Sequence, residues 1–205
     1  LSVETTGAGR TDTGVHAVGQ VVSFVAIEEL DLVRLQRSLN GILHPEVVVT
    51  RLAMEAPGFD ARFSAAWREY RYQILNGPHP DPLRRTFTWH VSDSLDLDAM
   101  NGAAEQLIDE HNFASFCRVA ASSASVRRVL VARWTADLPL VVLRIRANAF
   151  CHQMVRSMVG FMVEVGRGRL RAEETAAVLA AADRSAAGPM APPQGLILWE
   201  VGYEG

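Results

Sequence analysis

The sequence of 205 residues contains no lysine, so all 20 of its basic residues are arginines. It has only two cysteines, Cys117 and Cys151, and no apolar run near the 18 or so residues that a membrane span requires. Two cysteines do not make a disulfide framework, and we expect them to be buried thiols of a cytoplasmic protein. The histidines lack metal-ligand spacing, so we expect no metal. Because no apolar run is long enough to span a membrane, we also expect no membrane partner.

Net charge does not settle whether the chain binds nucleic acid. The net charge is −3 and the pI is about 6.1, which is not the basic balance typical of a nucleic-acid-binding domain. Arginine, however, binds phosphate through two N–H groups and stacks on bases, so a local arginine-lined cleft is compatible with an acidic whole. The hydrophobic share of 49% is enough for one substantial core or two small ones.

A glycine-rich stretch at residues 7–20 places one carboxylate, Asp12, shortly before residues 21–25, which we expect to form a buried strand. Arg10 lies two residues from Asp12, and a cation at that range lowers the pKa of an aspartate by roughly 1–3 units. An ionised carboxylate there can act as nucleophile or base. Taken alone, a glycine-flanked aspartate more often caps a backbone N–H. The glycine spacing is not that of a dinucleotide-binding loop, because a strand and not a helix follows.

Hydrophobic periodicity predicts helices and strands that alternate along the chain. Helices are expected at residues 32–42, 96–111, 151–165 and 173–182, and strands at 21–25, 47–53, 67–75, 126–134, 140–148 and 196–201. Asp31 is the expected N-cap of the first helix. Short turns between strands favour an α+β fold with helices over a mostly antiparallel sheet. A proline-rich break at 76–82 divides the chain into an N-terminal half, 1–80, and a C-terminal half, 81–205.

Two further residues are candidates for a site. Tyr70 lies on the strand predicted at 67–75, where a tyrosine is more often a half-buried core residue than a site residue. Arg156 interrupts the apolar helix predicted at 151–165, where an unpaired buried charge is costly. The Arg156 side chain either reaches solvent or forms an ion pair with Asp12, and the pattern alone gives both the same weight.

Three segments resemble motifs of the TruA family of tRNA pseudouridine synthases. RTDTGVHAVGQV at residues 10–21 is similar to the catalytic loop of that family, ARFSAAWREYRY at 61–72 to its second motif, and NAFCHQMVRSMVG at 148–160 to its third. The resemblance covers nearly the whole chain. Family members carry an extra strand and helix before the catalytic loop, and these are missing here, so we expect the start of the chain to be truncated.

The resemblance implies two ferredoxin-like halves that share a mostly antiparallel sheet around a central RNA-binding cleft. It implies an isomerase that converts uridine to pseudouridine at positions 38–40 of the tRNA anticodon stem-loop, without a cofactor and as a homodimer. By the same resemblance Asp12 is the catalytic residue and Arg156 pairs with it, while Tyr70 stacks on the uracil, Arg10 holds the flipped nucleotide and Leu196 packs beside the base.

Two other functions stay open at this point. A non-catalytic RNA-binding module on the same fold would bind tRNA and form no pseudouridine. A hydrolase that uses Asp12 as its nucleophile would release free uracil. The sequence gives the hydrolase little support, because it has no Gly-x-Ser-x-Gly or Ser-x-x-Lys motif and no second acid near Asp12.

Overall fold

The structure is a computed structural model that describes residues 3–26, 29–118 and 125–203. Its α-helices are α1 (Leu32–Leu43), α2 (Leu97–Glu105), α3 (Met154–Gly166) and α4 (Glu174–Ala181). Its strands are β1 (Thr5–Gly7), β2 (His16–Ala17), β3 (Val22–Phe24), β4 (Ala65–Asn76), β5 (Trp89–Val91), β6 (Asp109–Asn112), β7 (Val126–Asp137), β8 (Leu140–Ala147) and β9 (Leu196–Tyr203). Over these residues, no helix is both long enough and apolar enough to cross a membrane.

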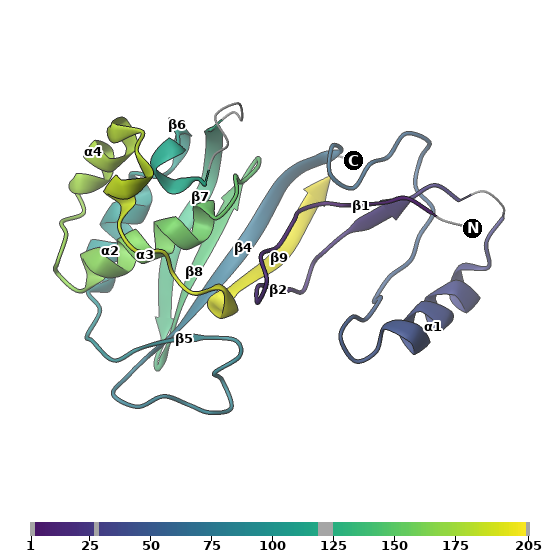
Figure 1. The fold of residues 1–205 in the computed structure, drawn as a ribbon, viewed down its shortest axis with the longest axis horizontal. Coiled ribbons are helices and arrows are strands. Elements are labelled where there is room, and N and C mark those ends of the chain that lie inside the picture. The colour runs from purple at the N-terminus through teal and green to yellow at the C-terminus, as the bar shows by residue number, and fades with distance from the viewer. Residues whose placement is uncertain (1–2, 27–28, 119–124, 204–205) are drawn as a thin grey trace.

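The main sheet has the strand order β2-β9-β4-β8-β7-β6, and β5 pairs with the end of β4. The long strand β4 is antiparallel to β8 on one side and to β9 on the other, while the short pairings β2–β9 and β4–β5 are parallel. Helices α2, α3 and α4 lie together on one side of this sheet, and α1 lies far from them (Figure 1). The predicted α+β fold with a mostly antiparallel sheet is therefore confirmed. The division of the chain at residue 80 stays a prediction.

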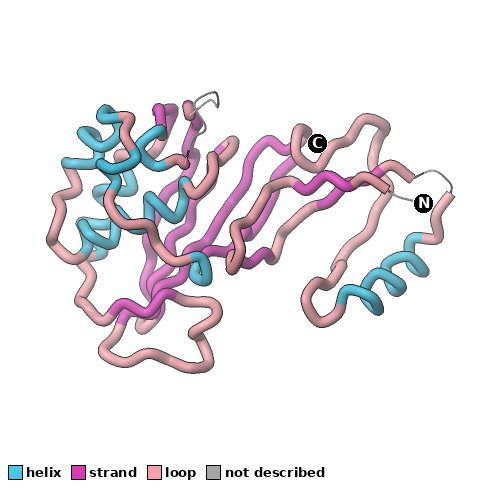
Figure 2. Tube along the Cα trace, in the orientation of Figure 1, coloured by secondary structure: helices cyan, strands magenta, loops and turns pink. Residues whose placement is uncertain are grey.

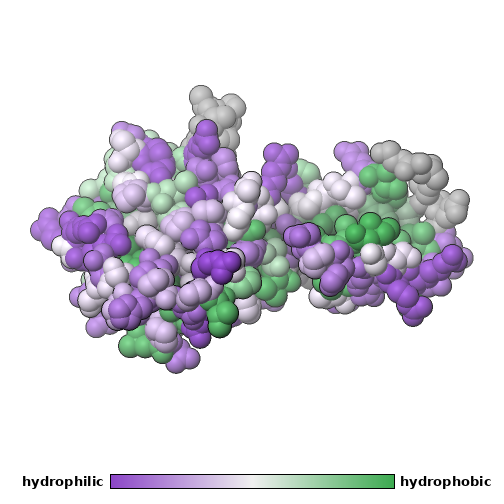
Figure 3. Space-filling view, turned by 60° about the horizontal axis from the view of Figure 1, so that its bottom comes forward, coloured by the Kyte–Doolittle hydropathy of each residue, from purple (hydrophilic) through white to green (hydrophobic). Residues whose placement is uncertain are grey.

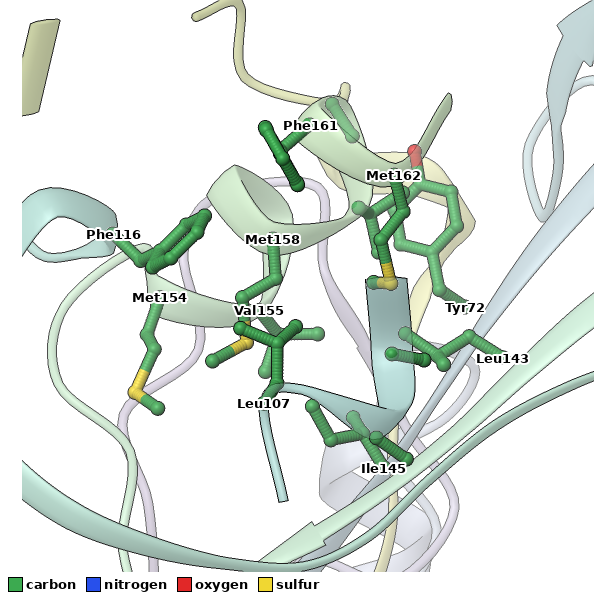
Figure 4. Close-up of a cluster of buried hydrophobic side chains, with 14 of the residues drawn as sticks. Tyr72, Leu107, Phe116, Leu143, Ile145, Met154, Val155, Met158, Phe161 and Met162 are labelled. Carbon is green, nitrogen blue, oxygen red and sulfur yellow. The ribbon is translucent and has the colours of Figure 1, made fainter. Parts of the chain in front are cut away.

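Helix α3 forms the centre of the core. Its sequence is apolar nearly all round, and every residue of the helix except Glu164 is buried. Figure 4 shows Met162 of this helix beside Leu143 of β8 and the ring of Tyr72 of β4. Burying a side chain of this size stabilises the fold by about 1.5–3 kcal/mol. The well-packed part of the molecule therefore lies between β4–β8 and helices α2 and α3.

The N-terminal part of the chain is thinly packed. Asp31 caps α1 as predicted, because its carboxylate accepts a hydrogen bond from the Arg34 N–H at 3.0 Å. The expected apolar face of α1 is nevertheless not buried, and Ile42 is 79% exposed. Residues 21–25 were expected to form a buried strand, but β3 pairs only with β1 and is exposed. Figure 2 shows that much of the chain between β1 and β4 is loop, and Figure 3 shows apolar side chains on the surface near β1 and β3.

Two other expected elements differ from the structure. Residues 47–53 form no strand, because the side chains of Gln36 and Asn40 on α1 bond to the backbone of Val49 in place of a neighbouring strand. The helix expected at 96–111 ends at Glu105, and Asp109–Asn112 forms β6 against β7. The apolar spacing of the helix continues past its end because the residues after it are buried in the same core.

The two cysteines form a disulfide, so the expectation of free thiols is wrong. The Cα atoms of Cys117 and Cys151 lie 5.7 Å apart, within the usual range for a disulfide. The bridge joins the segment after the 3-10 turn Ala114–Phe116 to the segment just before α3. Residues 34 positions apart are brought together by the packing of that turn against the C-terminal helices, which the spacing of two cysteines does not reveal.

Candidate active site

Asp12 is the first residue of a tight turn. The Val15 N–H donates to the Asp12 carbonyl at 3.0 Å, and Gly14 between them has a φ of 85°. This left-handed conformation is one that a residue with a Cβ rarely adopts, which explains the glycine at this position. The turn leaves the Asp12 carboxylate partly exposed. The side chain is therefore accessible to a large substrate.

The Arg156 guanidinium forms an ion pair with Asp12. Its Nη1 donates to Asp12 Oδ2 at 2.7 Å, and its Nε donates to the carbonyl of Ala191 at 2.9 Å. Arg156 is only 9% exposed, so it does not extend into solvent. Of the two readings that the sequence left open for this residue, the structure has the ion pair. A charge-assisted bond of this length is among the strong ones in proteins, so Arg156 fixes one carboxylate oxygen.

His152 is a second partner of Asp12 to which the sequence analysis assigned no role. Its Nε2 lies 3.1 Å from Asp12 Oδ1, and its side chain is 52% exposed. The residue precedes α3 and lies four positions before Arg156, inside the third motif. Its place in the third motif was the one sequence feature that pointed to a role at the site. A lone histidine without metal-ligand spacing does not reveal that its partner is a carboxylate on a distant loop.

Tyr70 lies on β4 beside the same loop. Its ring is 8% exposed and packs edge-on against Phe150, with 5.1 Å between ring centroids. Its hydroxyl lies close to Gly9 of the loop. Burial raises the pKa of Tyr70 to about 12, an effect that Arg68 opposes and the Asp12 carboxylate reinforces. Tyr70 is therefore a neutral phenol at physiological pH, close enough to Asp12 for that carboxylate to oppose its ionisation.

The remaining two predicted residues lie at different depths. Arg10 is exposed on the loop, and within the described ranges the side chains that contact the Asp12 carboxylate are Arg156 and His152. The cation next to the carboxylate is thus not its neighbour in sequence. Leu196 is buried at the start of β9, opposite Tyr72 in the β4–β9 register. The structure brings Asp12, Arg156 and Tyr70 together, with Arg10 on the surface of the loop and Leu196 in the core.

A family model and the similar proteins named below carry one description. A family model described as tRNA pseudouridine synthase matches residues 103–204. The tRNA pseudouridine synthase A of Halalkalibacterium halodurans is 42% identical over 199 residues, which cover 96% of this chain and 75% of the relative. The protein of the same name from Frankia casuarinae is 45% identical over 98% of this chain and 74% of the relative. That from Bacillus subtilis is 37% identical over 96% of this chain and 80% of the relative. The chain belongs to the tRNA pseudouridine synthase A family. Pseudouridine synthases are isomerases, since the product has the same atoms as the substrate.

In this member of the pseudouridine synthase family, Arg68 joins the glycine-rich stretch at residues 7–20 to the second and third motifs. Its guanidinium donates to the carbonyl oxygen of Ala8 in the loop at 3.3 and 3.2 Å and to that of Asn148 before α3 at 3.1 Å. In its own motif it donates to the carbonyls of Ala65 and Arg62. Arg68 was part of the second motif in the sequence but was given no role there, because its partners are backbone atoms that only the fold brings together.

One hollow of this synthase lies away from the Asp12 site. It has a volume of about 700 Å³ and lies between the start of α2 and the end of α3. None of its lining residues belongs to the group around Asp12. The Asp12 and His152 side chains are 23% and 52% exposed, so a substrate as large as a folded RNA can reach them from solvent.

Proposed function

We propose that this chain converts uridine to pseudouridine at positions 38–40 of the tRNA anticodon stem-loop, with Asp12 as the catalytic residue and no cofactor. The observation that supports this most directly is the partly exposed Asp12 carboxylate, paired with a buried Arg156 and next to Tyr70. In the reaction the bond between C1′ and N1 of the nucleotide breaks, the uracil turns, and C5 bonds to C1′. The hydrogen on C5 leaves as a proton and N1 gains one, so nothing is oxidised.

Asp12 is suited to this reaction because a carboxylate is ionised at neutral pH and is a competent nucleophile. It can attack the sugar or the base to form a covalent intermediate, or remove a sugar proton to give a glycal. Both routes place the nucleotide against the exposed side of the Asp12 turn. Arg156 is the positioning residue in either route, because it holds one oxygen from the buried side.

Access to the nucleotide requires that the base leave its helix, since enzymes that act on a base remove it from the stack. Tyr70 would stack on the displaced uracil, a contact worth about 1–3 kcal/mol. Because little of the ring is exposed, stacking requires the loop around Gly9 to move when RNA binds. Arg10 lies at the surface of that loop and would hold the flipped nucleotide. Leu196 would pack beside the base.

The homodimer, with tRNA held across two copies, and the cytoplasmic location both stay predictions. Arginines supply all the positive side chains for RNA contacts, apart from protonated histidines, because the sequence has no lysine. Contacts between arginine and phosphate carry the salt dependence of RNA binding, so affinity for tRNA should fall steeply as salt rises.

The proposed function is tested with an unmodified tRNA transcript that carries tritium at C5 of its uridines. The unchanged chain should release tritium and form pseudouridine at positions 38–40. Asp12→Ala should reduce turnover at least about a thousandfold, because it removes the reacting group. Binding of the transcript should change little in the same variant, as measured by filter retention.

Other outcomes point to the other functions. A chain that binds tRNA tightly but forms no pseudouridine would be a non-catalytic RNA-binding module. Release of free uracil would indicate a hydrolase. Pseudouridine formation by Asp12→Ala at the normal rate would show that the reacting group lies elsewhere.

A further inference from the structure

The Asp12 carboxylate is held at both of its oxygens. Arg156 Nη1 binds Oδ2 at 2.7 Å, and His152 Nε2 lies 3.1 Å from Oδ1. A carboxylate held at one oxygen can still rotate about its last bond, whereas one held at two oxygens has a defined orientation. Arg156 makes its contact from the buried side, and the half-exposed His152 makes its contact from the outer side.

His152 is itself fixed by the segment that carries it. The His152 carbonyl accepts the Arg118 N–H at 2.9 Å, and the neighbours of these two residues, Cys151 and Cys117, form the disulfide. Gln153, on the other side of His152, has a φ of 65°, a left-handed conformation at the start of α3. The two segments are therefore joined at two successive positions. Cys117 and Cys151 are joined by the disulfide, and Arg118 and His152 by the backbone hydrogen bond. An exposed side chain on so constrained a backbone has a reproducible position.

We propose that His152 is a second positioning residue for the Asp12 carboxylate, held at that distance by the Cys117–Cys151 bridge. This inference rests on the proposed function, in which Asp12 is the reacting group. His152 fixes which face of the carboxylate meets the nucleotide and does not touch the reacting atoms. Reduction of the bridge by a dithiol consumes two electrons and two protons, gives two thiols and leaves the dithiol as a cyclic disulfide. Between the Cys117–Arg118 segment and the Cys151–His152 segment, the hydrogen bond from the Arg118 N–H to the His152 carbonyl then remains.

The test compares two substitutions of His152 by steady-state kinetics on the tRNA transcript. His152→Phe keeps a ring and removes the N–H, and His152→Gln keeps an N–H donor of similar reach. We expect kcat to fall about ten- to a hundredfold for His152→Phe, since misplacement of a reacting group costs up to that much, with KM changed less than threefold. His152→Gln should recover most of the lost kcat. The exposed His79 provides the matched control, because His79→Phe makes the same chemical change in a loop after β4.

Three results would overturn the role of His152. An unchanged kcat in His152→Phe would show that the contact does not matter. A rise in KM alone would show that His152 contacts the RNA. Equal losses of kcat in the Phe and Gln variants would show that the N–H donor of His152 is not responsible for the effect on kcat. These results are distinguishable from a failure of the proposed function. The proposed function is tested by pseudouridine formation in the unchanged chain and its loss in Asp12→Ala, and not by the His152 variants. Melting temperatures of all variants identify any loss caused by unfolding.

The role of the bridge is tested by reduction with dithiothreitol. Reduction should lower kcat severalfold in the unchanged chain and have little further effect in His152→Phe, because coupled residues are not additive. The double variant Cys117→Ser/Cys151→Ser should resemble the reduced chain and be insensitive to dithiothreitol. Equal losses on reduction with and without His152, or no loss at all, would overturn the role of the bridge.

Discussion

Two carboxylates on opposite sides of β4 show how single residues in this molecule depend on arginines from distant segments. Asp12 contacts Arg156 across 144 positions of sequence. Glu69, next to Tyr70 on β4 and 1% exposed, accepts hydrogen bonds from Arg144 and Arg146 at 2.9 Å each. Burial on its own raises the pKa of Glu69, but the hydrogen bonds from these two arginines outweigh it and hold the pKa below the ordinary value of 4.5.

Glu69→Gln should reduce the free energy of unfolding at pH 7 by about 1–2 kcal/mol, because two charge-assisted hydrogen bonds are weakened while water can still solvate the partly exposed arginines. The folded chain has the lower pKa at this position, so the stabilisation is present above about pH 4.5 and is lost as pH falls through the folded value. Urea unfolding between pH 7 and pH 3 should therefore show a steeper loss of stability in the unchanged chain than in the variant. Parallel curves would contradict the role of this carboxylate.

At the scale of elements, α3 crosses the loop before β9 so closely that the crossing point must be glycine. A Cβ on Gly160 would overlap the carbonyl oxygen of Pro189. Two residues further along the loop, Ala191 accepts from Arg156 Nε and donates its own N–H to the Arg156 carbonyl at 3.0 Å. The close approach of helix and loop therefore determines where the guanidinium of Arg156 lies.

Gly160→Ala should lower the free energy of unfolding by about 1–3 kcal/mol, because overlap with backbone forces the loop or the helix to move. Helix propensity alone would change stability in the opposite direction by about 1 kcal/mol. Turnover should also fall, since the loop that holds Arg156 is displaced. The matched control is Gly102→Ala on α2, where the added Cβ meets only Ala172 at an ordinary 3.4 Å. A stable, fully active Gly160→Ala variant would show that the loop adapts without cost.

Most elements were predictable from sequence because their apolar spacing and caps act locally. Asp31 and Asp96 each cap a helix through the N–H three residues on, and the strand pair β7–β8 follows from alternation. The expected strand at 47–53 failed because a run of valines forms a strand only where another strand is available to pair with it. The disulfide, the role of His152 and the carbonyl partners of Arg68 depend on contacts between distant segments, which single-sequence patterns do not encode.

At the scale of the whole molecule, the packing is uneven along the chain. Helix α1 has no buried residue, whereas every residue of α3 but Glu164 is buried. Local opening requires little free energy where few apolar contacts are lost, and approaches global unfolding where the core is disrupted. The candidate site lies between these two regions. The Asp12 turn belongs to the thinly packed N-terminal part of the chain, and Arg156 belongs to the well-packed helix α3.

Amide hydrogen exchange should therefore differ by at least about a thousandfold in protection between α1 and α3, after correction for intrinsic rates. Peptides from α1 should be fully exchanged within minutes, and those from α3 should exchange only with global unfolding. Mass spectrometry of peptic fragments resolves the two helices. Comparable protection in α1 would mean that its exposed apolar residues are covered in solution.

The long separation between Asp12 and its two partners has a consequence for synthesis of the chain. A ribosome makes the Asp12 turn before the segment that supplies His152 and Arg156, which lie 140 and 144 positions further along the chain. A nascent chain therefore carries its carboxylate without these partners while the residues between them are being added, and the three side chains first meet when α3 docks beside the loop.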